Sequence, residues 1–323
     1  MEHTDIKQDL TGDSGDGGFL DEVLAGLSKS PKTLPCKYLY DEKGSQLFDA
    51  ICELDEYYPT STEEMVLRDN SGEIADLIGP EAQLIEYGAG SLQKVRILLD
   101  SMEAPAAVIP LDISREHLMA SAKTLAEEYP QVEILPVCAD FSTPTSLPEP
   151  VGNPEAKKVG FFPGSTIGNF TPEEVINFLE IVADDLGAQG EFLLGVDVKK
   201  DESILRAAYN DREGVTAAFN INLLHRINRE LKGNFDLSKW RHDAIYNDDR
   251  GRVEMHLVSQ CAQTAHIMGQ PFEFTKDETI HTESSHKYNI EEFVDLAKSA
   301  GFSSLQTWMD KKSMFSVHYL KVA

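Results

Sequence analysis

The chain has 323 residues, of which 41% are hydrophobic and 26% are charged, a composition typical of a soluble globular protein with one large or two ordinary domains. Its 55 acidic residues against 29 basic ones give a formal net charge of −26, and no Lys/Arg cluster forms the basic face that a nucleic-acid-binding protein needs. No apolar run approaches the roughly 20 residues of a membrane helix, so we expect no membrane segment.

Residues 1–17 have neither a basic start nor an apolar core, so we expect a solvated, disordered arm here and not a signal peptide. These features favour a cytoplasmic protein, which we expect to be a monomer. The four cysteines are scattered, and none forms a C-x-x-C pair or has a neighbour at metal-ligand spacing. The sequence therefore predicts no metal site.

Residues 84–91, LIEYGAGS, have the pattern of a buried strand that ends in an acid and runs into a glycine turn, and a helical pattern follows over 94–100. A strand, a glycine turn and a helix N-terminus form a nucleotide-binding corner, because glycines let the backbone approach a ligand closely. A dinucleotide-binding protein should have a third glycine at the position of Gln93. The E-x-G-x-G pattern instead suits S-adenosylmethionine, and these residues alone leave the cofactor open.

Strand and helix patterns then alternate along the chain. Strands are expected at 106–112, 132–140, 158–162 and 191–197, and helices at 116–128 and from Thr171 onward. The segment 171–174, TPEE, has the cap, the first-turn proline and the acid of a capping box. This alternation predicts an α/β fold with a parallel, doubly wound, Rossmann-like sheet.

The pattern breaks in residues 199–286, which are more polar. Helices are expected there at 203–210 and 214–232, and strands at 252–259 and 270–274. A helix at 290–300 and strands at 303–309 and 313–322 close the chain, as in the class I sheet of S-adenosylmethionine methyltransferases. We therefore expect a cofactor-binding core of residues 61–198 and 287–323, and a second, substrate-binding domain of residues 18–60 and 199–286.

Several side chains follow the expected strand ends, where an open parallel sheet binds its ligand. Asp112 ends the second strand, where an acid can pair with ribose hydroxyls, and Asp140 with Phe141 ends the third, where a carboxylate and a ring can hold adenine. The loop 164–169, GSTIGN, follows the fourth strand and ends in an amide that can both donate and accept, as an amino-acid substrate requires. Each acid alone is more often a helix cap, but acids at three successive strand ends favour a binding site.

Two further segments also have a structural interpretation. The aromatic pair before proline in 57–60, YYPT, is often only a packing feature. The run 283–287, ESSHK, is usually a solvated face, and a histidine such as His286 is more often structural than catalytic.

Motifs spread over nearly the whole chain from Leu34 carry a family resemblance. They are KYLYD at 37–41, GSQLFD at 44–49, EYYPT at 56–60 with TE at 62–63, GSTIGN at 164–169, GVTAAFN at 214–220, EM at 254–255 and TESSHK at 282–287. Together they closely resemble the histidine-specific, S-adenosylmethionine-dependent methyltransferases, the L-histidine Nα-methyltransferase family of ergothioneine biosynthesis. The glycine turn is shared by many methyltransferases, whereas GSTIGN and T-E-x-S-x-K are specific to the family.

The resemblance implies residue roles on the cofactor side. S-adenosylmethionine would be held by Gly88, Lys94, Asp112, Asp140 and Phe141. The departures from the family pattern are small, since only Tyr87 and Ala89 vary within the glycine turn.

The resemblance also implies roles on the side of L-histidine. Asn169 and Tyr209 would bind its α-carboxylate, Asn169 and Tyr40 would lie beside its α-amine as catalytic residues, Tyr57, Glu283 and Ser285 would recognise the imidazole, and Met255 would line that end. A glutamate can accept from an imidazole N–H and a serine can serve the other ring nitrogen. Ser284 and His286, which flank this pair, are expected to point elsewhere.

The implied reaction is three methyl transfers from S-adenosylmethionine to the α-amine, which would give hercynine. The residues leave the proton's route open between solvent and Tyr40. One rival is an Nα-methyltransferase of the same family that acts on another amino acid, such as tryptophan. A rival of another class is a non-catalytic S-adenosylmethionine-binding regulatory protein, and a nicotinamide dehydrogenase is disfavoured by Gln93.

Overall fold

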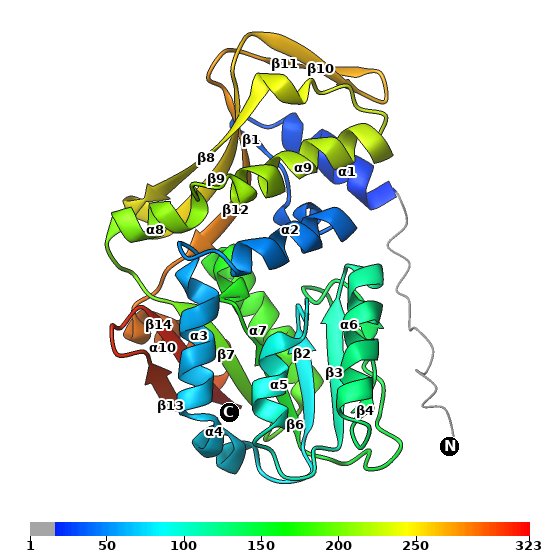
Figure 1. The fold of residues 1–323 in the computed structure, drawn as a ribbon, viewed down its shortest axis with the longest axis vertical. Helices are drawn as coiled ribbons and strands as arrows, with labels where there is room; N and C mark the ends of the chain where they lie inside the picture. The colour runs from blue at the N-terminus through cyan, green and yellow to red at the C-terminus, as the bar shows by residue number, and fades with distance from the viewer. Residues whose placement is uncertain (1–16) are drawn as a thin grey trace. The chain divides into compact units, whose positions relative to one another are not determined.

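A computed structural model describes residues 17–323 and divides them into two compact units (Figure 1). The core unit comprises Pro59–Lys199 and Lys287–Ala323, and the second unit comprises residues 17–58 and Lys200–His286. Residues 1–16 of the predicted arm lie outside the described residues, and Gly17 already begins helix α1. No helix formed by residues 17–323 is long and apolar enough to cross a membrane.

The core unit contains an eight-stranded sheet with the strand order β13-β14-β7-β6-β2-β3-β4, in which β5 also pairs with β3. The strands are β2 (Gln83–Tyr87), β3 (Ala107–Asp112), β4 (Glu133–Ile134), β5 (Val137–Cys138), β6 (Lys158–Phe162), β7 (Glu191–Asp197), β13 (Phe302–Met309) and β14 (Phe315–Val322). Pairs among β2 to β7 are parallel, whereas β14 is antiparallel to both β7 and β13. The predicted α/β fold, a doubly wound parallel sheet completed by a C-terminal hairpin, is confirmed.

Helices cover both faces of this sheet (Figure 1). They are α3 (Tyr58–Asp69), α4 (Ser71–Ile78), α5 (Gln93–Leu99), α6 (Arg115–Glu128), α7 (Pro172–Leu186) and α10 (Ile290–Ser299). Apolar side chains of α3 to α6 pack into one hydrophobic cluster, and those of α7 and α10 pack into another. Leu84 belongs to the first cluster and its neighbour Ile85 to the second, so β2 is buried on both faces, as a central parallel strand must be.

Helix α7 begins with the predicted capping box. The backbone N of Thr171 donates to Oε2 of Glu174 at 2.7 Å, and the backbone N of Glu174 donates to Oγ1 of Thr171 at 3.3 Å. Two N–H groups at the helix start are thereby satisfied by side chains.

The third predicted strand, 132–140, is interrupted in the structure. β4 ends at Ile134 and β5 begins at Val137, and Pro136 lies between them. Proline has no N–H to donate to a neighbouring strand, so the ladder stops there. The prediction of a continuous strand ending in Asp140 is wrong, because this acid lies in the turn after β5.

The second unit contains a four-stranded sheet of order β1-β12-β9-β8 and a two-stranded hairpin of β10 and β11. Its strands are β1 (Lys32–Thr33), β8 (Trp240–Asn247), β9 (Arg252–Ser259), β10 (Gln263–Ile267), β11 (Gln270–Phe274) and β12 (Thr279–His286). Its helices are α1 (Gly17–Leu27), η1 (Cys36–Leu39), α2 (Glu42–Cys52), α8 (Glu202–Tyr209), α9 (Val215–Glu230), η3 (Leu237–Lys239) and η4 (Asp248–Arg250). The two predicted strands at 252–259 and 270–274 are confirmed, whereas β8, β10 and β12 were not predicted.

The run 283–287 is not a solvated face, and that interpretation of the sequence is wrong. Glu283 to His286 form the end of β12, and every residue from Thr282 to Lys287 is buried. Successive side chains of a strand point to opposite faces, so Glu283 and Ser285 share one face while Ser284 and His286 share the other.

The inserted segment of residues 200–286 leaves and rejoins the core unit at one point. Val198 forms a parallel bridge with Tyr288, the backbone N of Tyr288 donates to O of Asp197 at 3.1 Å, and the backbone N of Lys199 donates to O of Tyr288 at 3.3 Å. The two ends of the insertion are therefore held side by side by backbone hydrogen bonds.

Candidate functional site

The first part of the candidate site is the glycine turn that leaves β2. The order of the sheet reverses between β2 and β6, and such sheets bind ligands at the carboxyl ends of the strands at this point. Gly88 and Gly90 have φ angles of 67° and 51°, in the left-handed region that favours glycine. A Cβ at Gly88 would lie 3.3 Å from Cε1 of Phe141, so this glycine also leaves room for that ring.

Asp112 ends β3 and fixes the same turn. Its Oδ2 accepts from the backbone N of Gly90 at 3.0 Å, and its Oδ1 accepts from the backbone N of Ser114 at 2.8 Å. Burial raises the pKa of Asp112, and these two N–H groups oppose the shift. Each carboxylate oxygen has a further lone pair, so Asp112 can accept from a ribose hydroxyl while it holds the turn.

Asp140 and Phe141 lie in the turn after β5. Oδ1 of Asp140 accepts from the backbone N of Ser142 at 3.0 Å, which orders the turn. The ring of Phe141 meets Phe162 in an edge-on contact with 5.5 Å between the centroids, and it also lies beside Gly88. The structure thus brings Phe141 to the glycine turn, as a ring that covers adenine requires.

Glu86 is the acid of the glycine motif. Its side chain is buried in β2, and burial raises its pKa well above the ordinary value. Its Oε2 has no hydrogen-bond partner within residues 17–323. A buried acceptor at the start of the turn fits a ligand that brings its own donor, such as the ammonium of an amino-acid group.

Lys94 lies in the first turn of α5 and is linked to Glu63, a residue to which the sequence assigned no role. Nζ of Lys94 donates to Oε2 of Glu63 at 2.5 Å, and the same oxygen accepts from the backbone N of Gly164 at 2.7 Å. Glu63 therefore joins the segments that follow β2 and β6. Its only sequence signal is its place in the TE pair at 62–63 of the family motif.

The loop after β6 carries Asn169 in the short helix η2 (Thr166–Asn169). Ser165 adopts a left-handed conformation with φ 57°, and its Oγ accepts from the backbone N of Asp197 at 2.9 Å. Oδ2 of Asp197 in turn lies 2.7 Å from Nζ of Lys287, with both side chains 0% exposed. The lysine of the T-E-x-S-x-K motif is thus a buried support of the GSTIGN loop, a role that the sequence did not reveal.

The second unit gathers most of the residues expected at the substrate. The hydroxyl of Tyr209 donates to Oγ of Ser285 at 2.8 Å, and the rings of Tyr57 and Tyr209 meet edge-on at 5.9 Å. Glu283 lies directly opposite Met255 in the β12–β9 pair, so their side chains share one face of the sheet. All five side chains are buried.

Tyr40 belongs to the same cluster. Its ring meets that of Phe219 at 5.4 Å and that of Phe48 at 5.5 Å. Burial raises the pKa of Tyr40 well above its ordinary value, and the negative charge of Glu283 raises it further. Tyr40 is therefore a neutral phenol at physiological pH, able to donate or accept a hydrogen bond.

The structure therefore places the predicted residues in two sets. The core unit holds Gly88, Lys94, Asp112, Asp140, Phe141 and Asn169, and the second unit holds Tyr40, Tyr57, Tyr209, Met255, Glu283 and Ser285. Within each unit, the contacts above bring together residues that are far apart in the sequence.

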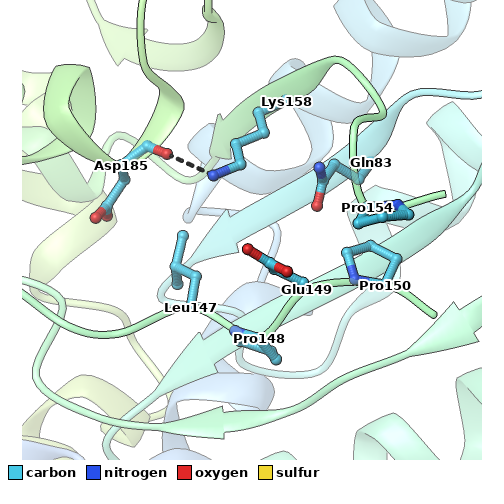
Figure 2. A pocket seen from close by; sticks show the side chains of 8 residues that line it. All are labelled: Gln83, Leu147, Pro148, Glu149, Pro150, Pro154, Lys158 and Asp185. Atoms are coloured by element: carbon cyan, nitrogen blue, oxygen red, sulfur yellow. Dashed lines mark hydrogen bonds between the residues drawn. The ribbon is translucent and has the colours of Figure 1, made fainter.

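A separate cavity of about 150 Å³ lies at the other end of the core sheet (Figure 2). It is lined by Gln83 and Lys158, the first residues of β2 and β6, and by Asp185 near the end of α7. Figure 2 shows Nζ of Lys158 directed at the backbone O of Asp185, at 3.2 Å. None of the predicted site residues lines this cavity, in keeping with a ligand at the carboxyl ends of the strands.

The reversing sheet, the glycine turn and the acids around it define an S-adenosylmethionine-dependent methyltransferase. The chain belongs to the family of histidine-specific, S-adenosylmethionine-dependent methyltransferases, whose sequence model matches residues 19–322. The predicted family, enzyme class and methyl donor are thereby confirmed.

Three relatives span most of this chain. It is 40% identical to histidine N-alpha-methyltransferase from Mycolicibacterium smegmatis, over 95% of this chain and 96% of that protein. It is 32% identical to ergothioneine biosynthesis protein 1 from Neurospora crassa, over 86% of this chain and 32% of that longer protein. It is 29% identical to an L-tryptophan methyltransferase from Psilocybe serbica, over 93% of this chain and 91% of that protein.

Proposed function

We propose that this enzyme methylates the α-amino group of L-histidine three times and gives hercynine for ergothioneine biosynthesis. The observation that carries the proposal is the buried polar end of the second unit, where Glu283 and Ser285 share one face of β12. We propose the second unit as the substrate-binding domain and the core unit as the binding domain for S-adenosylmethionine.

The chemistry of Glu283 and Ser285 matches a neutral imidazole. Such a ring has one N–H donor and one acceptor nitrogen, which a carboxylate and a hydroxyl can satisfy together. The indole of tryptophan has only one N–H and no acceptor nitrogen, so it would leave the serine hydroxyl without a ring partner. An unmatched buried polar group is costly, and this favours histidine over the substrate of the Psilocybe serbica relative.

The hydroxyl of Tyr209 has one proton, which it donates to Ser285 in this structure. In the proposed complex, Tyr209 and Asn169 bind the α-carboxylate of histidine. Binding then redirects the tyrosine proton to the carboxylate, and Ser285, which only accepts from Tyr209, uses its own hydroxyl proton to donate to the imidazole.

Asn169 and Tyr40 are proposed to hold the α-amine. The amine must be neutral, because its lone pair forms the new N–C bond while the C–S bond of the donor breaks and its electron pair stays on sulfur. S-adenosylmethionine supplies the electrophilic methyl group. The protein aligns the reacting atoms and excludes water.

The proton that leaves the methylated amine needs an acceptor. The raised pKa of Tyr40 keeps its phenol protonated at neutral pH, so no phenolate is present to take up that proton. We therefore propose that Tyr40 orients the amine through a hydrogen bond and that the proton leaves to solvent before each of the next two transfers.

Mass spectrometry of the product tests the proposal. The protein is incubated with S-adenosylmethionine and L-histidine, with L-tryptophan in a parallel reaction. We expect trimethylated histidine and no methylated tryptophan. A product that stops at one or two methyl groups would refute the threefold transfer, and no transfer to histidine would refute the substrate. Binding of S-adenosylmethionine without transfer to any amino acid would support the non-catalytic alternative.

A further inference from the structure

Glu63 is a buried acid in α3 that the reaction described above does not use. Its side chain is 0% exposed, and its Oε2 accepts from both the Lys94 ammonium and the Gly164 backbone N–H. Lys94 lies in the first turn of the helix after β2, and Gly164 lies in the loop after β6. These two segments flank the place where the strand order reverses.

The sheet makes room for this carboxylate. A Cβ at Gly195, in the middle of β7, would lie only 1.9 Å from Oε1 of Glu63. The backbone does not demand glycine there, because the φ of Gly195 is not positive. Glycine at this position is instead explained by the space that Glu63 occupies and, at 2.9 Å from such a Cβ, by Cε1 of Phe315.

The environment of Glu63 would lower the stability of the fold if this acid had only a structural role. Oε2 receives two donors, but Oε1 is buried without a hydrogen-bond partner in the described part of the chain. A buried carboxylate with one unsatisfied oxygen destabilises the fold, and an apolar side chain of similar size would avoid that penalty. The placement therefore indicates that Glu63 has a function at the glycine turn after β2.

We propose that Glu63 is a positioning residue that holds the Lys94 ammonium toward the carboxylate of the amino-acid end of S-adenosylmethionine. An ammonium has three N–H donors, and Glu63 takes one of them, which fixes the direction of the others. The hydrogen bond from the backbone N–H of Gly164 to the same carboxylate oxygen holds the loop after β6 beside Lys94. This inference rests on the proposed role of Lys94 in binding the methyl donor.

The proposal makes a specific prediction about ligands. S-adenosylhomocysteine carries the amino-acid carboxylate, whereas 5′-methylthioadenosine keeps the adenosine and the sulfur but lacks that end. Glu63→Gln retains the length and an acceptor for Gly164 but removes the charge that orients Lys94. We expect binding of S-adenosylhomocysteine to weaken about tenfold, as for loss of a charge-assisted hydrogen bond, and binding of 5′-methylthioadenosine to stay unchanged.

Titration calorimetry of the full chain measures the change in affinity for each of the two ligands, and histidine is not needed. Glu64→Gln is the matched control, because Glu64 is the next residue of α3 and its partner is Arg68, at 3.5 Å. Equal losses for both ligands, or no loss for S-adenosylhomocysteine, would overturn the inference. Failure of methyl transfer to histidine would overturn the proposed substrate and leave this result untouched.

Two further variants test whether Glu63 acts through Lys94. In a Lys94→Met background, Glu63→Gln should cause no additional loss of S-adenosylhomocysteine binding, since coupled residues are not additive. Gly195→Ala should displace the carboxylate and reproduce the ligand-selective loss, which keeps the test available if Glu63→Gln does not fold. Additive losses in the double variant would contradict the proposed coupling.

Kinetics give an independent readout. A contact with the amino-acid end is the same before and during methyl transfer, so Glu63→Gln should raise KM for S-adenosylmethionine and leave kcat and KM for histidine unchanged. A fall in kcat with unchanged KM would assign Glu63 to the chemical step and refute a positioning role.

Discussion

The buried ion pair between Lys287 and Asp197 makes a quantitative prediction about stability. The ammonium lies 2.7 Å from the carboxylate, and both side chains are 0% exposed. Lys287→Met keeps most of the side-chain volume but leaves a charged carboxylate in the interior without this cation. Breaking a buried ion pair in this way costs about 3–5 kcal/mol. For a domain of this size, the loss corresponds to a fall in Tm of roughly 6–20 °C.

Thermal unfolding followed by circular dichroism measures the effect against two references. Lys199→Met removes an exposed ion pair with Glu292, at 2.8 Å, and should cost less than about 1 kcal/mol. The double variant Lys287→Met/Asp197→Asn removes both buried charges and should recover most of the loss, because replacing a buried pair by neutral groups is often nearly neutral. Equal Tm values for Lys287→Met and Lys199→Met would refute the reasoning. A double variant as unstable as the single one would assign the loss to packing rather than charge.

The other predictions concern histidine binding and pH. Glu283→Gln should raise KM for histidine about tenfold or more, as measured by steady-state kinetics. The control variant Glu273→Gln, at an exposed position of strand β11, should leave this KM unchanged. Tyr209→Phe removes the hydroxyl that contacts Ser285 and should raise KM for histidine by about 2–10-fold, and an unchanged KM would contradict the proposed contact. Burial lowers the pKa of His281 from 6.5 to about 4, so the unfolded chain binds the proton more readily and stability is lost as the pH falls from about 6.5 to about 4. His281→Gln should flatten the slope of unfolding free energy in this range by up to about 1.4 kcal/mol per pH unit, measured by urea titration at several pH values.

The sequence predicts the core sheet well because its strands are buried on both faces. Such strands are near-continuous apolar runs, and those from Gln83, Lys158 and Glu191 onward are bounded by helices with clear periodicity. The interruption at Pro136 could have been predicted, because a proline cannot donate to the ladder.

The second unit is harder to predict because its strands are polar. Strand β8 buries only Trp240 and Ala244 and not every second residue, and β12 buries the segment TESSH, which has no apolar side chain. Such a segment is buried because of its function and the residues that pack around it, and not because it is hydrophobic. Pattern analysis alone therefore assigned the 283–287 run to a solvated surface.

The residues around the glycine turn also differ in how well the sequence alone predicts them. Asp112 and Phe141 follow strands and are visible as a local pattern. Glu63 has no such signal, because its partners Lys94 and Gly164 lie 31 and 101 positions away along the chain. Only the tertiary fold, together with the space left by Gly195, reveals that the three belong together.

The adjoining ends of the 200–286 insertion have a consequence for how such enzymes diversify. Because Val198 bridges to Tyr288 and the neighbouring backbone groups hydrogen-bond, the sheet is continuous without the segment between them. The insertion joins the core at two adjoining points, but it is not a module by itself, because β12 pairs with β1 and Asn222 donates to Asp41 in residues 17–58. A recombination event there would replace Tyr209, Met255, Glu283 and Ser285 in one step and leave every strand of the methyl-donor sheet in place. An exchanged segment would also have to fit residues 17–58, which belong to the same unit and carry Tyr40 and Tyr57.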